Sequence, residues 1–196
     1  MNQIAPAAQQ RHAKLRYVAC VGMMTAVCYV ITLLCQFIPP FAGFLSFDLK
    51  DVVVVIGSFI FGPLAGLALA VLPSFLEFIT YSTTGPVGLL MNILATAAFT
   101  LPAALIYKHD KTRRNAIIGL VTGVLCMTVA MLLWNYIVTP GYMHVPRDVV
   151  AAMLVPTFLP FNLVKGSINA LLATVLYKPV VGALRRAGLA PEHRED

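Results

Sequence analysis

Three polar residues recur on one face of the last apolar segment of the chain. Asn162, Lys165 and Asn169 stand at positions i, i+3 and i+7, so a helix places them in one stripe. Two carboxamides and an ammonium offer hydrogen-bond donors and acceptors. They form no nucleophile–base pair and no metal-ligand set, so the chemistry that they indicate is reversible binding of a small polar molecule.

Two other apolar segments carry polar lines of their own. Thr128 and Asn135 fall on one helical face, and Asn92, Thr96 and Thr100 follow one another at four-residue spacing. Such side chains either hydrogen-bond between helices or line a binding site. Because three separate segments each present a polar line, we predict a ligand site between them, with interhelical hydrogen bonding as the alternative.

Lys165 lies well inside its apolar run, far from both Arg147 and Lys178. A lysine near a segment end extends its ammonium to the membrane interface, which is the alternative here. Its central position favours a group that faces other helices. Pro160 removes a backbone donor and frees the carbonyl of Pro156, so we expect a bend beside the stripe and a site open toward the outer side.

The loop FLSFDLKD adds aromatic and acidic side chains. Phe47 and Asp48 suit the mouth of a pocket for a flat ligand. As an alternative, Asp48 or Asp51 caps the helix that follows, and for Asp51 we expect this capping role. Glu77 is either exposed at the rim or a counter-charge to Lys165.

The composition excludes a water-soluble domain. The 196 residues have a mean hydropathy of +0.84 and only 11% charged residues, and apolar runs recur along nearly the whole chain. There is no GxxxxGK[ST] phosphate loop, and the histidines lie in tails or loops, so we expect neither ATP hydrolysis nor another enzymatic activity, and no metal site. The cysteines, predicted to be small buried apolar side chains, are Cys20, Cys28, Cys35 and Cys126.

The apolar runs predict a single all-α membrane domain with six helices, the second of them short. A basic tail (1–16) precedes the helices and a second tail (178–196) follows them. The predicted helices span 17–38, 51–61, 63–80, 86–107, 115–138 and 149–177, the last of them interrupted by Pro156 and Pro160.

The basic residues explain the net charge of +6 as a topology signal, so we expect no nucleic-acid partner. The opposite side carries only Lys50 and Arg147. With six helices, both tails and the loop between the fourth and fifth helices lie on one side, predicted to be cytoplasmic. Its basic residues are Arg11, Lys14, Arg16, Lys108, Lys111, Arg113, Arg114, Lys178, Arg185 and Arg186.

Small residues four positions apart let helix backbones approach closely in lipid. The pairs are Gly22 with Ala26, Gly62 with Gly66, and Gly119 with Gly123. They either pack the bundle internally or dock another membrane subunit, and Gly22 with Ala26 is the preferred docking candidate.

Four segments in this order resemble the substrate-binding S components of energy-coupling factor (ECF) transporters, and among them the riboflavin-specific S components. The resemblance covers nearly the whole chain. In particular, an NY pair precedes a P-x-Y loop and a PFN-x-x-K segment follows it. The segments are FLSFDLKDVVVVIGSFIFGPLAG, TGPVGLLMNILATAAFTLPAALIYK, KTRRNAIIGLVTGVLCMTVAMLLWNYIVTPGY and PFNLVKGSINALLATVLYKP.

The resemblance implies a six-helix subunit of a bacterial cell-membrane vitamin importer that captures riboflavin from outside as its ligand, with no further cofactor. It also implies three partners: the membrane-coupling subunit EcfT and two cytoplasmic ATPases. Polar residues matching Asn135, Asn162 and Lys165 would bind the flavin ring beneath the first outer loop, and Gly22 and Ala26 match the small-residue motif that docks EcfT.

The predicted ligand-binding residues are Phe47, Asp48, Tyr81, Asn92, Thr128, Asn135, Asn162 and Lys165. Phe47 stands where the family has a tyrosine and therefore lacks that hydroxyl. An S component for another vitamin or a nucleobase-like compound is the first alternative. The second is a structural membrane protein whose polar lines only join helices.

Overall fold

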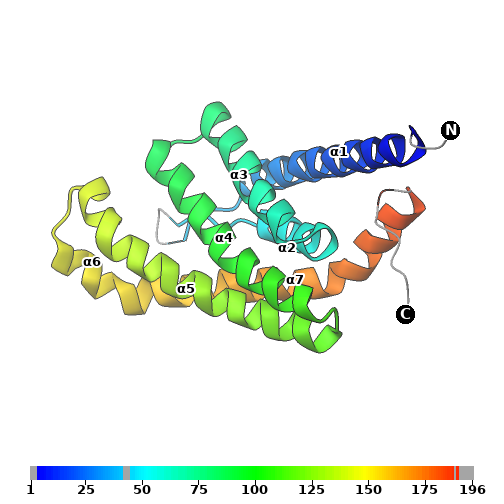
Figure 1. The fold of residues 1–196 in the computed structure, drawn as a ribbon. Helices are drawn as coiled ribbons and strands as arrows, with labels where there is room; N and C mark the ends of the chain where they lie inside the picture. The colour runs from blue at the N-terminus through cyan, green and yellow to red at the C-terminus, as the bar shows by residue number, and fades with distance from the viewer. Residues whose placement is uncertain (1–3, 42–44, 188, 190–196) are drawn as a thin grey trace.

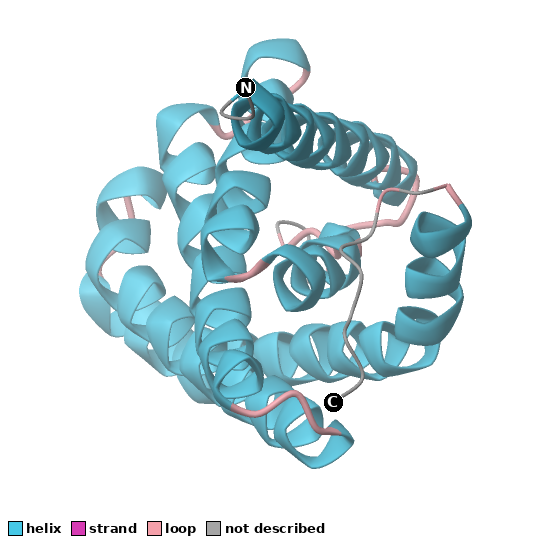
Figure 2. Ribbon diagram, turned by 45° about the vertical axis from the view of Figure 1, so that its right-hand side comes forward, coloured by secondary structure: helices cyan, strands magenta, loops and turns pink. Residues whose placement is uncertain are grey.

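The computed structural model describes residues 4–41, 45–187 and 189. This part of the chain forms helices and the loops between them, without a strand (Figure 2). A single antiparallel bridge joins Phe41 and Leu45 in the loop after the first helix. The all-α prediction is confirmed.

Six helical passes make up the described part, as predicted. Five are long and apolar enough to cross a membrane, and α2 is the short one. The sixth pass runs through α6, a π-helical turn and α7 without a break. The elements are α1 (Ile4–Cys35), α2 (Lys50–Phe61), α3 (Pro63–Thr80), α4 (Gly85–His109), α5 (Arg113–Met143), α6 (Arg147–Met153), the π-helical turn (Leu154–Phe158) and α7 (Leu159–Arg186).

Several helices extend beyond the predicted bounds. α1 includes most of the predicted N-terminal tail, α5 continues through Pro140 to Met143, and α7 runs past 177 to Arg186. The predicted bounds follow the apolar runs, but alanine, glutamine, lysine and arginine continue a helix readily outside the membrane. Residues 1–3, 188 and 190–196 of the predicted tails lie outside the described residues.

The predicted interruption at Pro156 and Pro160 is a π-helical turn instead of a break. The N–H of Leu159 donates to the carbonyl of Leu154, five residues back. A proline lacks the N–H that an α-helix needs, and a wider turn re-pairs the freed carbonyls locally. The polar stripe therefore begins one turn after a helix irregularity.

The short helix α2 occupies the middle of the bundle. It packs against α1, α3, α4 and α7. Val54, Val55 and Ile56 are almost fully enclosed, and even the first two residues of the helix, Lys50 and Asp51, are 1% exposed. A helix that is apolar on all sides is a core helix, and α2 has this pattern after its charged start.

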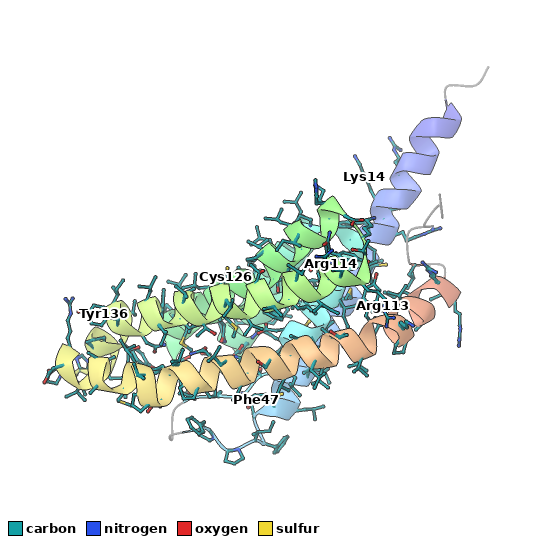
Figure 3. All side chains as sticks on the ribbon, turned by 90° about the horizontal axis from the view of Figure 1, so that it is seen from below. Lys14, Phe47, Arg113, Arg114, Cys126 and Tyr136 are labelled. Carbon is teal, nitrogen blue, oxygen red and sulfur yellow. The ribbon has the colours of Figure 1, made fainter. Side chains whose placement is uncertain are left out.

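The basic segments gather at one end of the bundle. The start of α1, the α4–α5 connection and the end of α7 lie on the same side of the molecule (Figure 1). Lys14, Arg113 and Arg114 lie at this end, and Tyr136 lies at the other (Figure 3). This arrangement follows from the even number of passes.

Three of the four cysteines are buried as predicted, but Cys126 is exposed. The prediction was wrong for Cys126 because α5 turns this side away from the bundle. Elsewhere on α5, Gly119 and Gly123 lie against the backbone of α4, where a Cβ on Gly123 would lie 2.3 Å from the carbonyl oxygen of Phe99. This pair therefore packs the bundle internally, which was one of the two expected roles.

Substituting Gly123 by alanine is expected to lower the free energy of unfolding by about 1–3 kcal/mol, because the new methyl group overlaps the α4 backbone. Gly141→Ala on the same helix is the matched control, since a Cβ there meets nothing within 4 Å. Thermal unfolding in detergent measures both. Equal melting temperatures for the two variants would contradict the close helix contact.

Candidate ligand-binding site

The loop that follows α1 ends inside the bundle, where Asp48 forms an ion pair with Lys50. The Lys50 ammonium binds Asp48 Oδ2, and the Lys50 backbone N–H donates to Asp48 Oδ1 at 2.8 Å. Burial, the largest single influence, raises the pKa of Asp48, but the charges of Lys50 and Lys165 and the hydrogen bonds from Lys50 together outweigh it and hold the pKa below its usual range. The Asp48 carboxylate is therefore ionised and already engaged.

Asn169 ties the same loop to α7. Its Nδ2 donates to the backbone carbonyl of Asp48 at 3.1 Å and to the carbonyl of Lys165 at 2.9 Å. The Asn169 side chain is 1% exposed, and its Oδ1 is enclosed without a hydrogen-bond partner. The end of the loop thus lies beside the polar stripe of α7.

Two further carboxylates face the same region from α2 and α3. Asp51 Oδ1 accepts a hydrogen bond from Thr96 Oγ1 at 2.7 Å. Glu77 Oε2 accepts one from Asn92 Nδ2 at 3.0 Å. Because α4 supplies both donors, its predicted polar line binds carboxylates of neighbouring helices.

Neither acidic residue is the N-cap of α2, because that position is held by Leu49, which makes no side-chain capping hydrogen bond. Asp48 accepts the N–H of Lys50, the first residue of α2, whereas the Asp51 carboxylate is turned to Thr96. Glu77 is partly buried and its carboxylate binds Asn92, and no ion pair joins it to Lys165 among the described residues.

Lys165 is 8% exposed, so its ammonium does not extend to the membrane interface. Asp48, Asp51 and Glu77 all lie within electrostatic range of it. Among the residues that the structure describes, however, Lys165 Nζ has neither an ion pair nor a hydrogen bond, whereas Lys50 Nζ has both with Asp48. A buried ammonium in this state has its donors available for an additional acceptor.

Three other predicted ligand-binding residues of α5 and α7 are buried but hydrogen-bond within their own helices. Asn135 Nδ2 donates to the Met131 carbonyl and Asn162 Nδ2 to the Phe158 carbonyl, at 2.7 and 2.8 Å. Thr128 is also buried, and its hydroxyl donates to the carbonyl of Val124. Within the described part of the chain, no hydrogen bond joins Asn135, Asn162 and Lys165 to one another, so interhelical hydrogen bonding does not account for these asparagines.

The remaining predicted residues lie around this cluster or on the surface. Phe47 is half-buried in the loop next to Asp48. Tyr81 follows the last residue of α3 with its ring 6.0 Å from that of Tyr29, and its hydroxyl is enclosed without a partner. Gly22 and Ala26 are exposed on α1.

Lys50 and Asp51 were missed as site residues. The sequence assigned Lys50 to the outer side as a topology charge, but the structure buries it. The sequence signal for this burial was the run DVVVVIGSFIF, which is apolar on all sides after its first residue. Such a run predicts a central helix, whose first turn is then buried as well. Among the described residues, no group of three or more histidine, cysteine or acidic side chains is arranged to hold a metal ion.

Comparison with known proteins places this geometry in context. The family model described as "ECF transporter, substrate-specific component" matches residues 16–177. Riboflavin transporter RibU of Staphylococcus aureus is 30% identical over 85% of this chain and 90% of its own length. Riboflavin transporter FmnP of Bacillus subtilis is 28% identical over 89% of this chain and 98% of its own length. A solved S component of a bacterial ECF transporter superimposes with a TM-score of 0.75, at 29% identity over 88% of this chain and 99% of that one.

Thr96→Val removes the hydroxyl that binds the enclosed Asp51 carboxylate and keeps the side-chain shape. The free energy of unfolding is expected to fall by about 1–3 kcal/mol, because a buried carboxyl oxygen loses its hydrogen-bond donor. Thr122→Val is the control, since the Thr122 hydroxyl binds only a carbonyl of its own helix at an exposed site. Unfolding in detergent compares them, and a stability loss as small for Thr96→Val as for the control would contradict this assignment.

Proposed function

The chain belongs to the substrate-specific components of ECF transporters, and we propose that the substrate which it captures is riboflavin. Membership makes it a multi-pass cell-membrane protein and the substrate-binding subunit of an importer. The names of the relatives support riboflavin as the substrate.

The observation that carries the proposal is the buried ammonium of Lys165, which has no ion pair or hydrogen bond among the described residues and lies on the same stripe of α7 as the carboxamides of Asn162 and Asn169. The edge of an isoalloxazine ring alternates carbonyl oxygens with an imide N–H. Lys165 and the Nδ2 groups of Asn135 and Asn162 would donate to the carbonyls, and an asparagine Oδ1 would accept the imide proton. Phe47, Tyr81, Asn92 and Thr128 would surround the ring, and no covalent step is required.

The same proposal sets the orientation. The basic end, with Lys14, Arg113 and Arg114, would lie in the cytoplasm and the loop that carries Asp48 would lie on the outer side. Riboflavin would then enter from outside.

Energy for release would come from partner subunits. EcfT and two cytoplasmic ATPases would bind this chain and reorient it, since binding alone only shifts the populations of existing states. The exposed Gly22 and Ala26 on α1 support docking at this helix, because small residues let a second helix approach closely in lipid.

Lys165→Met keeps the length of the side chain and removes its charge. Riboflavin affinity is expected to fall by about tenfold to a hundredfold, the loss expected for a hydrogen bond from a charged donor. Quenching of flavin fluorescence during titration of the purified protein measures it, and Lys178→Met, an exposed position on the same helix, is the control.

The wild-type protein itself decides the ligand. A flavin visible spectrum in protein purified from riboflavin-grown cells, together with saturable quenching, supports the proposal. No flavin absorbance and no quenching would contradict it. A screen of other vitamins and nucleobases by thermal shift then tests the alternative substrates. If none of them raises the melting temperature, the alternative of a structural membrane protein without a ligand is favoured.

Gly22→Leu is expected to abolish most riboflavin uptake in cells that contain EcfT and the ATPases, because the bulky side chain keeps the partner helix away. Riboflavin binding to the purified subunit should stay unchanged. Val30→Leu, at another exposed position of α1, is the control. Normal uptake by Gly22→Leu would argue against docking at this position.

A further inference from the structure

Three carboxylates and two ammonium groups lie between α2, α3, α4 and α7. Each carboxylate has a hydrogen-bond or ion-pair partner, and so does the Lys50 ammonium, but the Lys165 ammonium has none among the described residues. Lys50 forms an ion pair with Asp48, Thr96 donates a hydrogen bond to Asp51, and Asn92 donates one to Glu77. Each carboxylate therefore has a partner other than Lys165. Opposite charges attract strongly where water is excluded. The packing must therefore keep the three carboxylates on their own partners and away from the Lys165 ammonium.

Asp48 belongs to the loop that is joined to α7 next to Lys165. The two residues are connected through Asn169, which binds the carbonyl of each. Asp48 is 7% exposed and within electrostatic range of both lysines. Only the contacts of Lys50, one from its ammonium and one from its backbone N–H, keep the Asp48 carboxylate turned toward α2.

We propose that Lys50 is a positioning residue: by neutralising Asp48, it prevents an Asp48–Lys165 ion pair and keeps the Lys165 ammonium free for the ligand. Lys50 does not itself touch the ligand, since it is 1% exposed and its ammonium is bound to Asp48. This role rests on the proposed function for its effect on riboflavin, but the charge arrangement is testable without any ligand.

The first test uses riboflavin. Lys50→Met should lower the affinity by about a hundredfold, the size of effect expected when one partner of a buried ion pair is removed. Adding Asp48→Asn should restore most of the affinity, because no carboxylate then competes for Lys165. A double variant as weak as Lys50→Met overturns the proposal, and so does wild-type affinity in Lys50→Met.

The second test needs no ligand and measures the coupling between Asp48 and Lys165. Melting temperatures are compared for the wild type, Asp48→Asn, Lys165→Met and the double variant, and again with Lys50→Met in all four proteins. With Lys50 present, the effects of the two substitutions should nearly add. Without Lys50 they should deviate from additivity by about 5 °C or more, because Asp48 and Lys165 now pair.

Coupling of equal size with and without Lys50 overturns the proposal. If Lys50→Met does not fold, Lys50→Gln replaces it, since glutamine is neutral yet still donates a hydrogen bond to Asp48. The two tests also separate the inference from the proposed ligand. If the predicted coupling is found in a protein that does not bind riboflavin, only the proposed substrate is wrong. If Lys50→Met binds riboflavin tightly, only the proposed role of Lys50 is wrong.

Discussion

The ion pair between Asp48 and Lys50 joins a loop to the central helix at a depth where water is scarce. Charged groups are costly there unless a partner neutralises them and hydrogen bonds satisfy their remaining donors and acceptors. The pair depends on the length of α2, whose 12 residues span only about 18 Å. Because α2 is too short to cross the membrane, the loop before it must reach into the bundle.

Other features follow from the same constraint. The loop end meets α7 through Asn169, and α4 supplies Thr96 and Asn92 to the acidic groups of α2 and α3. Lys165 is left as the buried cation whose donors are available. Under the proposed function, the subunit would need such a prepared site and no reactive group, because other subunits would supply the energy for release.

Much of this organisation could be predicted from sequence because helical periodicity is local. The stripe of Asn162, Lys165 and Asn169 follows from spacing, and the position of Lys165 far from both ends of its run favoured a buried group over an interfacial lysine, as its 8% exposure confirms. The even number of passes and the clustering of basic residues at one end also follow from patterns that short segments carry on their own.

The charge pairs could not be predicted in the same way. Lys50 and Asp51 follow a loop, where charges usually face water, and their burial depends on packing by four other helices. The contacts of Asp51 with Thr96 and of Glu77 with Asn92 join residues on different helices, so spacing along one helix carries no signal for them. The π-helical turn after Met153 likewise replaced an expected break, because neighbouring carbonyls re-pair when prolines remove donors.

In the proposed site, Lys165 is held free for a flavin while Asp48 stays paired with Lys50. An experimental structure of the protein with bound riboflavin tests this most directly. We expect a flavin carbonyl oxygen within about 3.2 Å of Lys165 Nζ, with the Asp48–Lys50 ion pair intact. A flavin bound elsewhere, with Lys165 paired to a carboxylate, would contradict it.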